Sequence, residues 1–258
     1  MSDEGRMKLQ RRLVDEAASL YRPAGRFARF FARSKYTRDP LYATLLRTGA
    51  IPDASCLVDL GCGQGLLAAW LFTARKAWTG GTPWPDNLPV PAKVGTYLGI
   101  DRSRADIARA HRALPPFARS FRGDVRTLGP TLLDRCDVAT LFDVLHYLAP
   151  AAQEQLLASV HAGLPPWGVL LLRVGDPSMS ASRRIHVVDL VVGAARGRPR
   201  LRLHRRPVAR WIALLERIGF VVDVLDDGHA NVLLRASRTE AAQAAGSAVP
   251  VRSMTAIR

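Results

Sequence analysis

The stretch Val58–Ala68 places the strongest constraint on the fold of this chain. It begins as a short apolar strand ending in an acid, passes through three glycines at alternate positions and continues into a helix-forming run. A strand followed by a glycine turn and a helix places free backbone N–H groups and a helix N-terminus around one concave spot. Glycine suits such a turn because it adopts positive φ and lets a ligand approach the bare backbone. The sequence therefore predicts a nucleotide-type cofactor site at this turn.

The spacing of the glycines narrows the class of cofactor. The dinucleotide fingerprint is G-x-G-x-x-G, whereas Gly61, Gly63 and Gly65 form G-x-G-x-G. Leu66 stands where the third dinucleotide glycine would be. A phosphate-binding P-loop is excluded as well, since no Gly-Lys-Ser/Thr follows. With the acid Asp59 before the glycines, the segment resembles motif I of the class I S-adenosylmethionine (SAM) dependent methyltransferases.

Three further acids follow apolar runs, in the order that this family uses. Asp101 ends the second expected strand, where an acid in a doubly wound fold accepts hydrogen bonds from ribose hydroxyls. The resemblance implies that Asp124 takes the adenine amino group and that the next backbone N–H reaches the ring. Asp143 ends the central fourth strand. Cofactor binding is thereby expected of Asp59, Gly61, Cys62, Gly63, Gly65, Asp101, Arg102, Asp124, Val125 and Asp143.

The segment between the glycines and the second strand is unusually long. From Gly65 to Asp101 there are 36 positions, against about 20 in the dinucleotide pattern. Residues 78–91 contain four prolines and two glycines, which can neither continue a helix nor pair as a central strand. We expect a surface insertion whose two tryptophans pack it against the protein or contact a partner, and we favour packing.

Strands alternate with helices along the chain, so we expect an α/β fold. The resemblance implies a Rossmann-like, seven-stranded, mostly parallel sheet with an antiparallel last strand and helices on both faces. We expect an N-terminal helical extension over 1–50, the methyltransferase domain over 51–238 and a disordered tail over 239–258. Expected helices include 39–49, 104–114, 151–163, 182–195 and 208–218, and expected strands include 56–60, 97–101, 137–143, 169–174, 220–225 and 231–235.

Two further properties bear on where the protein acts. Its start lacks the apolar core of a signal peptide, and no run reaches the about 18 apolar residues of a membrane span, so we expect a cytoplasmic protein. Three cysteines without a closely spaced pair predict neither a disulfide framework nor a zinc site. No metal is expected, and Cys62 is interpreted as a small residue that fits the loop.

The formal net charge is +15, with 33 Arg and only four Lys. Such basicity arises from GC-rich coding, or it serves contact with nucleic acid, an anionic membrane or an acidic protein.

Residues 26–36 place Arg26, Arg29 and Arg33 on one helical face beside aromatics. This fits peripheral contact with an anionic membrane or a partner, or an ordinary helix whose phenylalanines pack on the core. A second basic cluster, 196–207, is expected to form a loop near the substrate. Neither has the aromatic ladder of a nucleic-acid binder.

The expected reaction is an in-line displacement, because SAM carries its methyl group on a cationic sulfur. The protein must hold donor and acceptor about 3 Å apart in a dry pocket. An oxygen acceptor must lose its proton, and His146 is the candidate general base. Alternatively, its ring packs around the sulfonium and adenine. Tyr147 is expected to line the acceptor pocket. His186, His204 and His229 are weaker candidates on the substrate side.

The second half of the chain is similar to bacterial methyltransferases encoded beside aryl polyene or fatty-acid-like pathways that depend on acyl carrier proteins. The resemblance is carried by Phe142–Tyr147, Leu164–Asp176, Arg206–Trp211 and Asn231–Leu234, together with the proline-tryptophan insertion. It implies a small aromatic or acyl acceptor, methylated at oxygen and bound to an acidic carrier protein. The basic clusters would complement the charge of that carrier.

Two other functions stay open. An RNA or tRNA methyltransferase would use the arginine surface, and a non-catalytic regulator would only bind SAM. Adenine amino methylation uses an Asn/Asp-Pro-Pro-aromatic run after the fourth strand, which Phe142–Leu145 does not match. Carbon-5 methylation of cytosine needs a catalytic cysteine that is absent from this segment. Nucleic acid is therefore a less favoured substrate, and the intact acids argue against a degenerate site.

Overall fold

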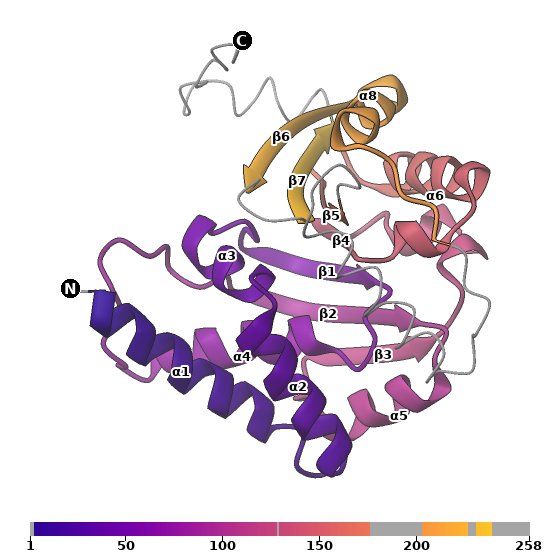
Figure 1. Ribbon diagram of the computed structural model, residues 1–258. Helices are drawn as coiled ribbons and strands as arrows, with labels where there is room; N and C mark the ends of the chain where they lie inside the picture. Colours follow the sequence, from indigo (N-terminus) through magenta and orange to yellow (C-terminus); the bar gives the residue numbers. More distant parts are fainter. Residues whose placement is uncertain (1–2, 128, 176–202, 227–230, 239–258) are drawn as a thin grey trace.

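The computed structural model describes residues 3–127, 129–175, 203–226 and 231–238. Its centre is a seven-stranded sheet of order β3-β2-β1-β4-β5-β7-β6 (Figure 1). The strands are β1 (Ala54–Leu60), β2 (Val94–Asp101), β3 (Ala118–Arg122), β4 (Val138–Phe142), β5 (Val169–Gly175), β6 (Phe220–Asp226) and β7 (Asn231–Arg238). The first five pair in parallel, and β7 runs antiparallel to β5 and β6. The predicted mostly parallel sheet with an antiparallel last strand is confirmed.

Helices precede, connect and flank these strands. The α-helices are α1 (Asp3–Ser19), α2 (Arg26–Arg38), α3 (Leu41–Thr48), α4 (Leu66–Thr79), α5 (Arg104–Ala113), α6 (Pro150–Gly163) and α8 (Val208–Ile218). Single 3-10 turns are η1 (Val125–Thr127), η2 (Pro130–Leu132) and η3 (Leu145–Tyr147). A proline occupies the first position of α6. Gly219 follows α8 in the left-handed conformation and ends that helix, as predicted.

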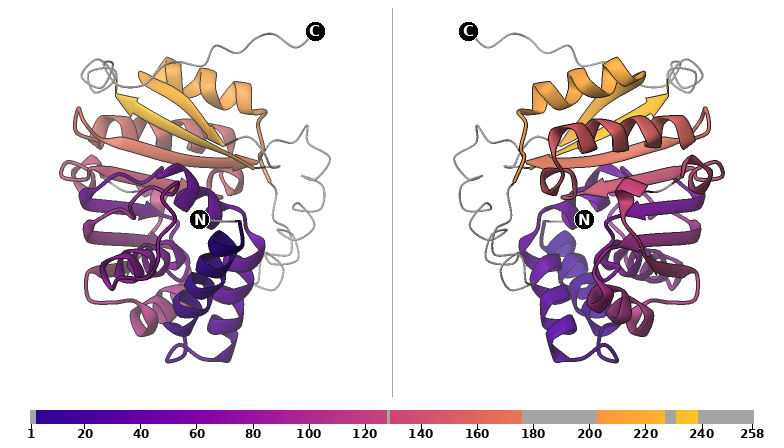
Figure 2. Two further views of the ribbon diagram at one scale, coloured as in Figure 1. Left: turned by 90° about the vertical axis from the view of Figure 1, so that its left-hand side faces the viewer. Right: turned by 90° about the vertical axis from the view of Figure 1, so that its right-hand side faces the viewer.

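Both faces of the sheet are covered, as expected (Figures 1 and 2). Successive side chains of a strand point to opposite faces. In β1, Leu57 joins a cluster with α3, α4 and α5, whereas Val58 and Leu60 join a cluster with α6 and α8. Every residue from Val169 to Val174 of β5 is buried, which explains its nearly continuous apolar sequence.

The N-terminal extension is helical and forms a further layer on the outer side of α4. Trp70 of α4 lies at the centre of this contact, with its ring 5.3 Å from that of Tyr36 on α2 and 5.4 Å from that of Tyr42 on α3. Buried residues of α1, α2 and α4 belong to one hydrophobic cluster. The extension therefore shares its core with the domain that follows it.

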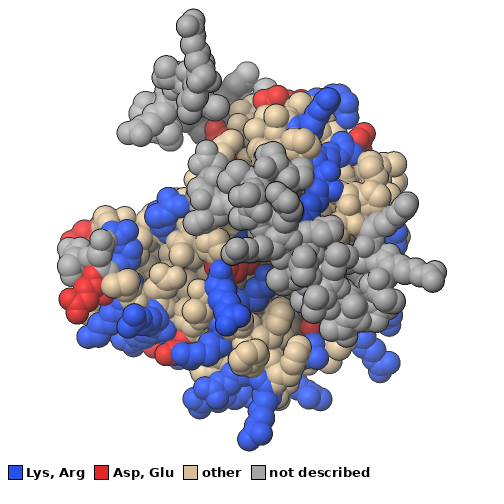
Figure 3. All heavy atoms as spheres, viewed as in Figure 1, with Lys and Arg blue, Asp and Glu red and all other residues tan. Residues whose placement is uncertain are grey.

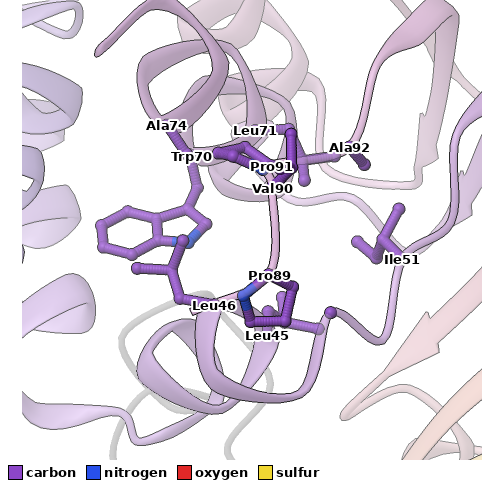
Figure 4. A pocket seen from close by; sticks show the side chains of 11 residues that line it. Leu45, Leu46, Ile51, Trp70, Leu71, Ala74, Pro89, Val90, Pro91 and Ala92 are labelled. Atoms are coloured by element: carbon purple, nitrogen blue, oxygen red, sulfur yellow. The ribbon is translucent and has the colours of Figure 1, made fainter. Parts of the chain in front are cut away.

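The insertion before β2 begins later than predicted, because α4 continues through Thr79. The half-buried Trp84 packs against the N-terminal cluster, and its Nε1 donates to the Pro89 carbonyl at 3.1 Å. Packing, the favoured interpretation, is confirmed for this tryptophan. A small apolar pocket remains between the insertion, α3 and α4 (Figure 4). Ile51 and Ala92, which line it, precede β1 and β2, so the pocket lies at the amino ends of the strands.

Several predicted features lie outside the described residues. These are the helix 182–195, the tail 239–258, His186, His229 and the larger part of the basic cluster 196–207. Among the helices that the structure describes, none combines the length and apolar character needed to span a membrane.

Candidate active site

The glycine loop follows β1 with positive φ at all three alternate glycines. A Cβ on Gly61 would lie 2.2 Å from Val144 Cγ2, and one on Gly65 would lie 2.5 Å from Leu114 Cδ1. A Cβ on Gly63 would meet no atom within 4 Å. Close packing therefore requires the outer two glycines, while the space beside Gly63 leaves room for a ligand.

The backbone N–H groups of this loop bond largely within the protein. Those of Gly61 and Cys62 donate to the Ile100 carbonyl at 2.8 and 3.0 Å. That of Gly63 donates to Asp101 Oδ2 at 3.0 Å. The expectation that these N–H groups are free is wrong, because the loop is attached to the end of β2. The open face of Gly63 and the carboxylates that end neighbouring strands are left to meet a cofactor.

Cys62 itself is buried in the loop. Burial raises the pKa of its thiol well above the ordinary value, so the thiol is protonated and a poor nucleophile. This agrees with the interpretation of Cys62 as a small packing residue.

Asp59 lies inside the sheet and is only 4% exposed. Its carboxylate accepts hydrogen bonds from Tyr97 Oη of β2 at 2.5 Å and from Thr140 Oγ1 of β4 at 2.7 Å. Burial raises the pKa of Asp59 to about 6, although the two hydroxyls favour the charged form. The carboxylate thus ties the three central strands together, and its contact with the cofactor stays a prediction.

Asp101 stands at the carboxyl end of β2, beside the loop. Its Oδ1 accepts from the Ser103 backbone N–H at 2.7 Å, in addition to the bond from Gly63. A carboxylate offers about four lone-pair sites, so two stay available for ribose hydroxyls. The backbone carbonyl of Asp101 accepts a hydrogen bond from the Gly123 N–H at 3.0 Å, which brings Asp124, the residue after Gly123, close to Asp101.

Asp124 follows β3 and is held by two arginines. Arg126 donates to Asp124 Oδ2 from Nη2 at 2.6 Å and to Oδ1 from Nε at 3.0 Å, and Arg102 Nε lies 3.5 Å from Oδ2. The hydrogen bonds from Arg126 lower the pKa of Asp124 to about 2. Val125 is buried in the core, so only its backbone is suited to reach a ring. An adenine amino group would therefore donate to a carboxylate that already accepts hydrogen bonds from Arg126.

Asp143 follows β4 with a φ of 60°, and it is the only non-glycine residue with positive φ among those described. Arg173 Nε donates to Asp143 Oδ1 at 2.9 Å, and Arg173 Nη2 pairs with Oδ2. Arg173 is 4% exposed and also holds Asp39, with 2.8 Å between Nη2 and Asp39 Oδ2. Burial favours the neutral carboxyls, but the guanidinium outweighs it and lowers the pKa of both Asp143 and Asp39.

His146 and Tyr147 lie in η3, directly after Val144, which packs on the glycine loop. Their ring centroids are 4.1 Å apart, with the planes inclined by 51°. The His204 backbone N–H donates to the His146 carbonyl at 2.8 Å. The structure therefore brings His204, a weaker candidate in the sequence, next to the leading one. Gln153 Nε2 fixes this arrangement through the carbonyls of Leu145, Leu148 and His204.

Sequence reasoning missed several residues around this site. Arg173 was predicted only as part of an apolar strand, and Asp39 only as a helix start. A single arginine within an otherwise apolar buried strand was the available signal, since a buried charge requires a partner. In the turn between α1 and α2, Tyr21 Oη donates to the Gln64 carbonyl at 3.0 Å, and on α2 Tyr36 Oη donates to the Leu66 carbonyl at 2.9 Å.

The described residues suit SAM. The space beside Gly63, the free lone pairs of Asp101 and the neighbouring Asp124 match the requirements of a cofactor with a ribose and an adenine. In the part of the chain that the structure describes, no group of three His, Cys, Asp or Glu side chains is arranged to hold a metal ion.

Comparisons with known proteins agree with this geometry. The family model described as a methyltransferase domain matches residues 24–246. Carboxy-S-adenosyl-L-methionine synthase of Alteromonas mediterranea is 26% identical over 167 residues, which cover 58% of this chain and 59% of that protein.

Two solved structures share the fold. Human N-acetylserotonin methyltransferase in complex with SAM has a TM-score of 0.57 and 16% identity, over 81% of this chain and 55% of that one. An O-methyltransferase family protein from Burkholderia thailandensis has a TM-score of 0.56 and 18% identity, over 81% of this chain and 58% of that one. The chain thus spans between half and two thirds of each of these proteins. With the sheet topology and the glycine loop, the family match shows that the chain belongs to the methyltransferase domain family.

Proposed function

We propose that this protein transfers a methyl group from SAM to an oxygen atom of a small aromatic or acyl acceptor carried by an acidic carrier protein. The observation that carries the proposal is the pair His146 and Tyr147, which η3 places directly after β4. Val144 of the same segment packs against Gly61, so the pair lies beside the loop expected to hold the cofactor.

The chemistry follows from these side chains. When bound, SAM supplies an electrophilic methyl group. The acceptor hydroxyl must lose its proton, and an imidazole nitrogen is suited to take it. The backbone of His146 is held in place by His204, which limits the motion of the base. The Tyr147 ring offers a flat apolar surface on which an aromatic acceptor can stack.

The comparisons support oxygen as the acceptor atom, since the Burkholderia protein is named as an O-methyltransferase family member. The acidic carrier is supported by the net charge of +15, because opposite charge speeds encounter between proteins.

The test uses methyl-labelled SAM with a panel of phenols and carboxylic acids, each offered free and bound to a carrier protein. Products are identified by mass spectrometry. We expect methylation at oxygen and faster turnover of the carrier-bound acceptor. His146→Gln should lower kcat by about 10²–10⁴-fold and leave the Kd for SAM unchanged. The matched control is His111→Gln on α5, where the ring nitrogen contacts the Ser120 carbonyl at 2.7 Å.

Five results would contradict the proposal in different ways. Equal rates with free and carrier-bound acceptors would remove the carrier, and full activity of His146→Gln would remove the general base. Label found only in RNA, and lost after nuclease treatment, would establish an RNA methyltransferase. Tight SAM binding without methylation of any acceptor class would indicate a regulator, while conversion of SAM to carboxy-SAM would match the name of the Alteromonas relative.

A further inference from the structure

Helix α2 has two faces of opposite character. Its inner face is buried through Ala28, Ala32 and Tyr36. On its outer face, Phe27 is 63% exposed and Phe30 is 71% exposed. The interpretation that the phenylalanines of this segment pack on the core is therefore wrong for these two, because the helical register turns them toward solvent. Such exposed rings indicate a contact surface when they lie together.

Arginines lie close to the two exposed phenylalanines in the sequence. Arg22, Arg26 and Arg29 are all exposed, and within the described ranges none of the three forms an ion pair with a carboxylate. Arg33, one turn further on, pairs with Asp15 of α1. Residues 3–38 contain ten Lys or Arg and four Asp or Glu. Figure 3 shows basic side chains gathered over α1, α2 and α5 along the lower side of the molecule.

We propose that the α2 face, formed by Arg26, Phe27, Arg29 and Phe30 of the helix with Arg22 of the turn before it, docks onto an anionic lipid bilayer. Phenyl rings on a basic helix enter the boundary between headgroups and acyl chains. Guanidinium groups bind phosphate oxygens through paired hydrogen bonds, and the negative surface potential of anionic lipids attracts them. The α2 face combines both kinds of group within about two helical turns.

A bilayer fits this surface better than a folded protein does. A stable protein interface buries about 1,200–2,000 Å² and has an apolar centre with matching shape. The apolar part of the α2 face is two phenyl rings on a convex helix. Two pockets of the described residues lie away from this face, one between the insertion, α3 and α4 and one between α5 and β3. Lipid molecules can pack around exposed rings, so a bilayer needs no preformed groove on the protein.

The inner side of the same helix contacts the cofactor loop. Gln64 Nε2 of the loop donates to the Ala28 carbonyl at 3.0 Å. A bilayer bound at the α2 face would therefore lie one helix away from the glycine loop. This inference rests on the exposed residues of α2 and does not depend on the identity of the methyl acceptor.

The test is vesicle flotation with the full chain. Vesicles of phosphatidylcholine alone are compared with vesicles of equimolar phosphatidylcholine and phosphatidylserine. We expect binding only to the second kind, and weaker binding as salt is raised. Each arginine lost should reduce the partition coefficient about fivefold, so Arg26→Gln/Arg29→Gln should reduce it about 25-fold. Phe30→Ser should reduce it about tenfold or more through lost ring insertion.

The matched control is Arg135→Gln/Arg210→Gln, which makes the same charge change at two exposed arginines outside the α2 face. All variants change exposed side chains, so their thermal unfolding should equal that of the original protein. The proposal is overturned by absence of binding to phosphatidylserine vesicles, or by equal losses in the control and in the α2 variants. It is also overturned if the α2 variants lose binding to an acidic carrier protein in gel filtration while vesicle binding is unaffected.

Discussion

Replacement of Arg173 by methionine tests the role assigned to the buried ion network. Arg173 is the shared partner of Asp39, which follows α2, and of Asp143, which follows β4. Methionine has a similar length without charge, so the main loss is the guanidinium. Removing one partner of a buried ion pair costs about 3–5 kcal/mol, because the remaining charge is left uncompensated. We expect the melting temperature at neutral pH to fall by roughly 10 °C.

The pH dependence distinguishes this mechanism from simple loss of packing. In the original protein, the pKa values of Asp39 and Asp143 lie below the ordinary value. Their contribution to stability is therefore present above the unfolded pKa and is lost as pH falls through the folded values. In Arg173→Met, burial acts without the guanidinium and raises both pKa values. The variant then gains stability relative to the original protein as the carboxyls are protonated, so the difference in unfolding free energy should shrink in acid.

Thermal unfolding followed by circular dichroism at neutral pH and at about pH 5 measures both effects. Arg173→Met/Asp39→Asn removes one of the two uncompensated carboxylates and should recover part of the stability. The control Arg210→Met makes the same substitution at an exposed position and should melt like the original protein. An Arg173→Met deficit that is small, or that stays constant with pH, would refute the assignment of a charge-compensating role.

Three further predictions concern the loop and its carboxylates. Gly61→Ala should destabilise the protein by about 1–3 kcal/mol, because its Cβ would lie 2.2 Å from Val144 Cγ2; Gly61→Ala/Val144→Ala should recover part of this loss in chemical denaturation. The pKa of Asp59 is raised to about 6, so the contribution of Asp59 to folding stability is lost as pH rises through that value. Asp59→Asn should therefore gain up to about 3 kcal/mol of unfolding free energy relative to the original protein between about pH 4 and pH 7. Parallel profiles of unfolding free energy against pH for the two proteins would contradict this. Asp101→Asn should weaken SAM binding about tenfold or more in isothermal titration calorimetry, and an unchanged Kd would exclude a ribose contact.

The sequence alone predicted the class of cofactor and determined most of the secondary structure. The strand, glycine loop and helix at Val58–Ala68 carry a local signal, since chain conformation and ligand approach there depend on adjacent residues. The α8 helix was predicted at its observed bounds of 208–218, and the glycine at 219 that ends it is a local signal. The buried strand β5 was evident from its apolar run.

Tertiary structure decided what the isolated patterns left open. Whether the rings at 27 and 30 face the core or solvent depends on how α2 rotates against α1. Helical periodicity cannot specify this rotation, because arginines and phenylalanines are interspersed along the helix. The pairing of Asp39 with Arg173 joins residues 134 positions apart, and no local rule assigns such a partner. The glycine loop itself was recognised from sequence, but its N–H groups proved to bond to β2. Only the approach of separate strands shows which polar groups are satisfied and which stay available to a ligand.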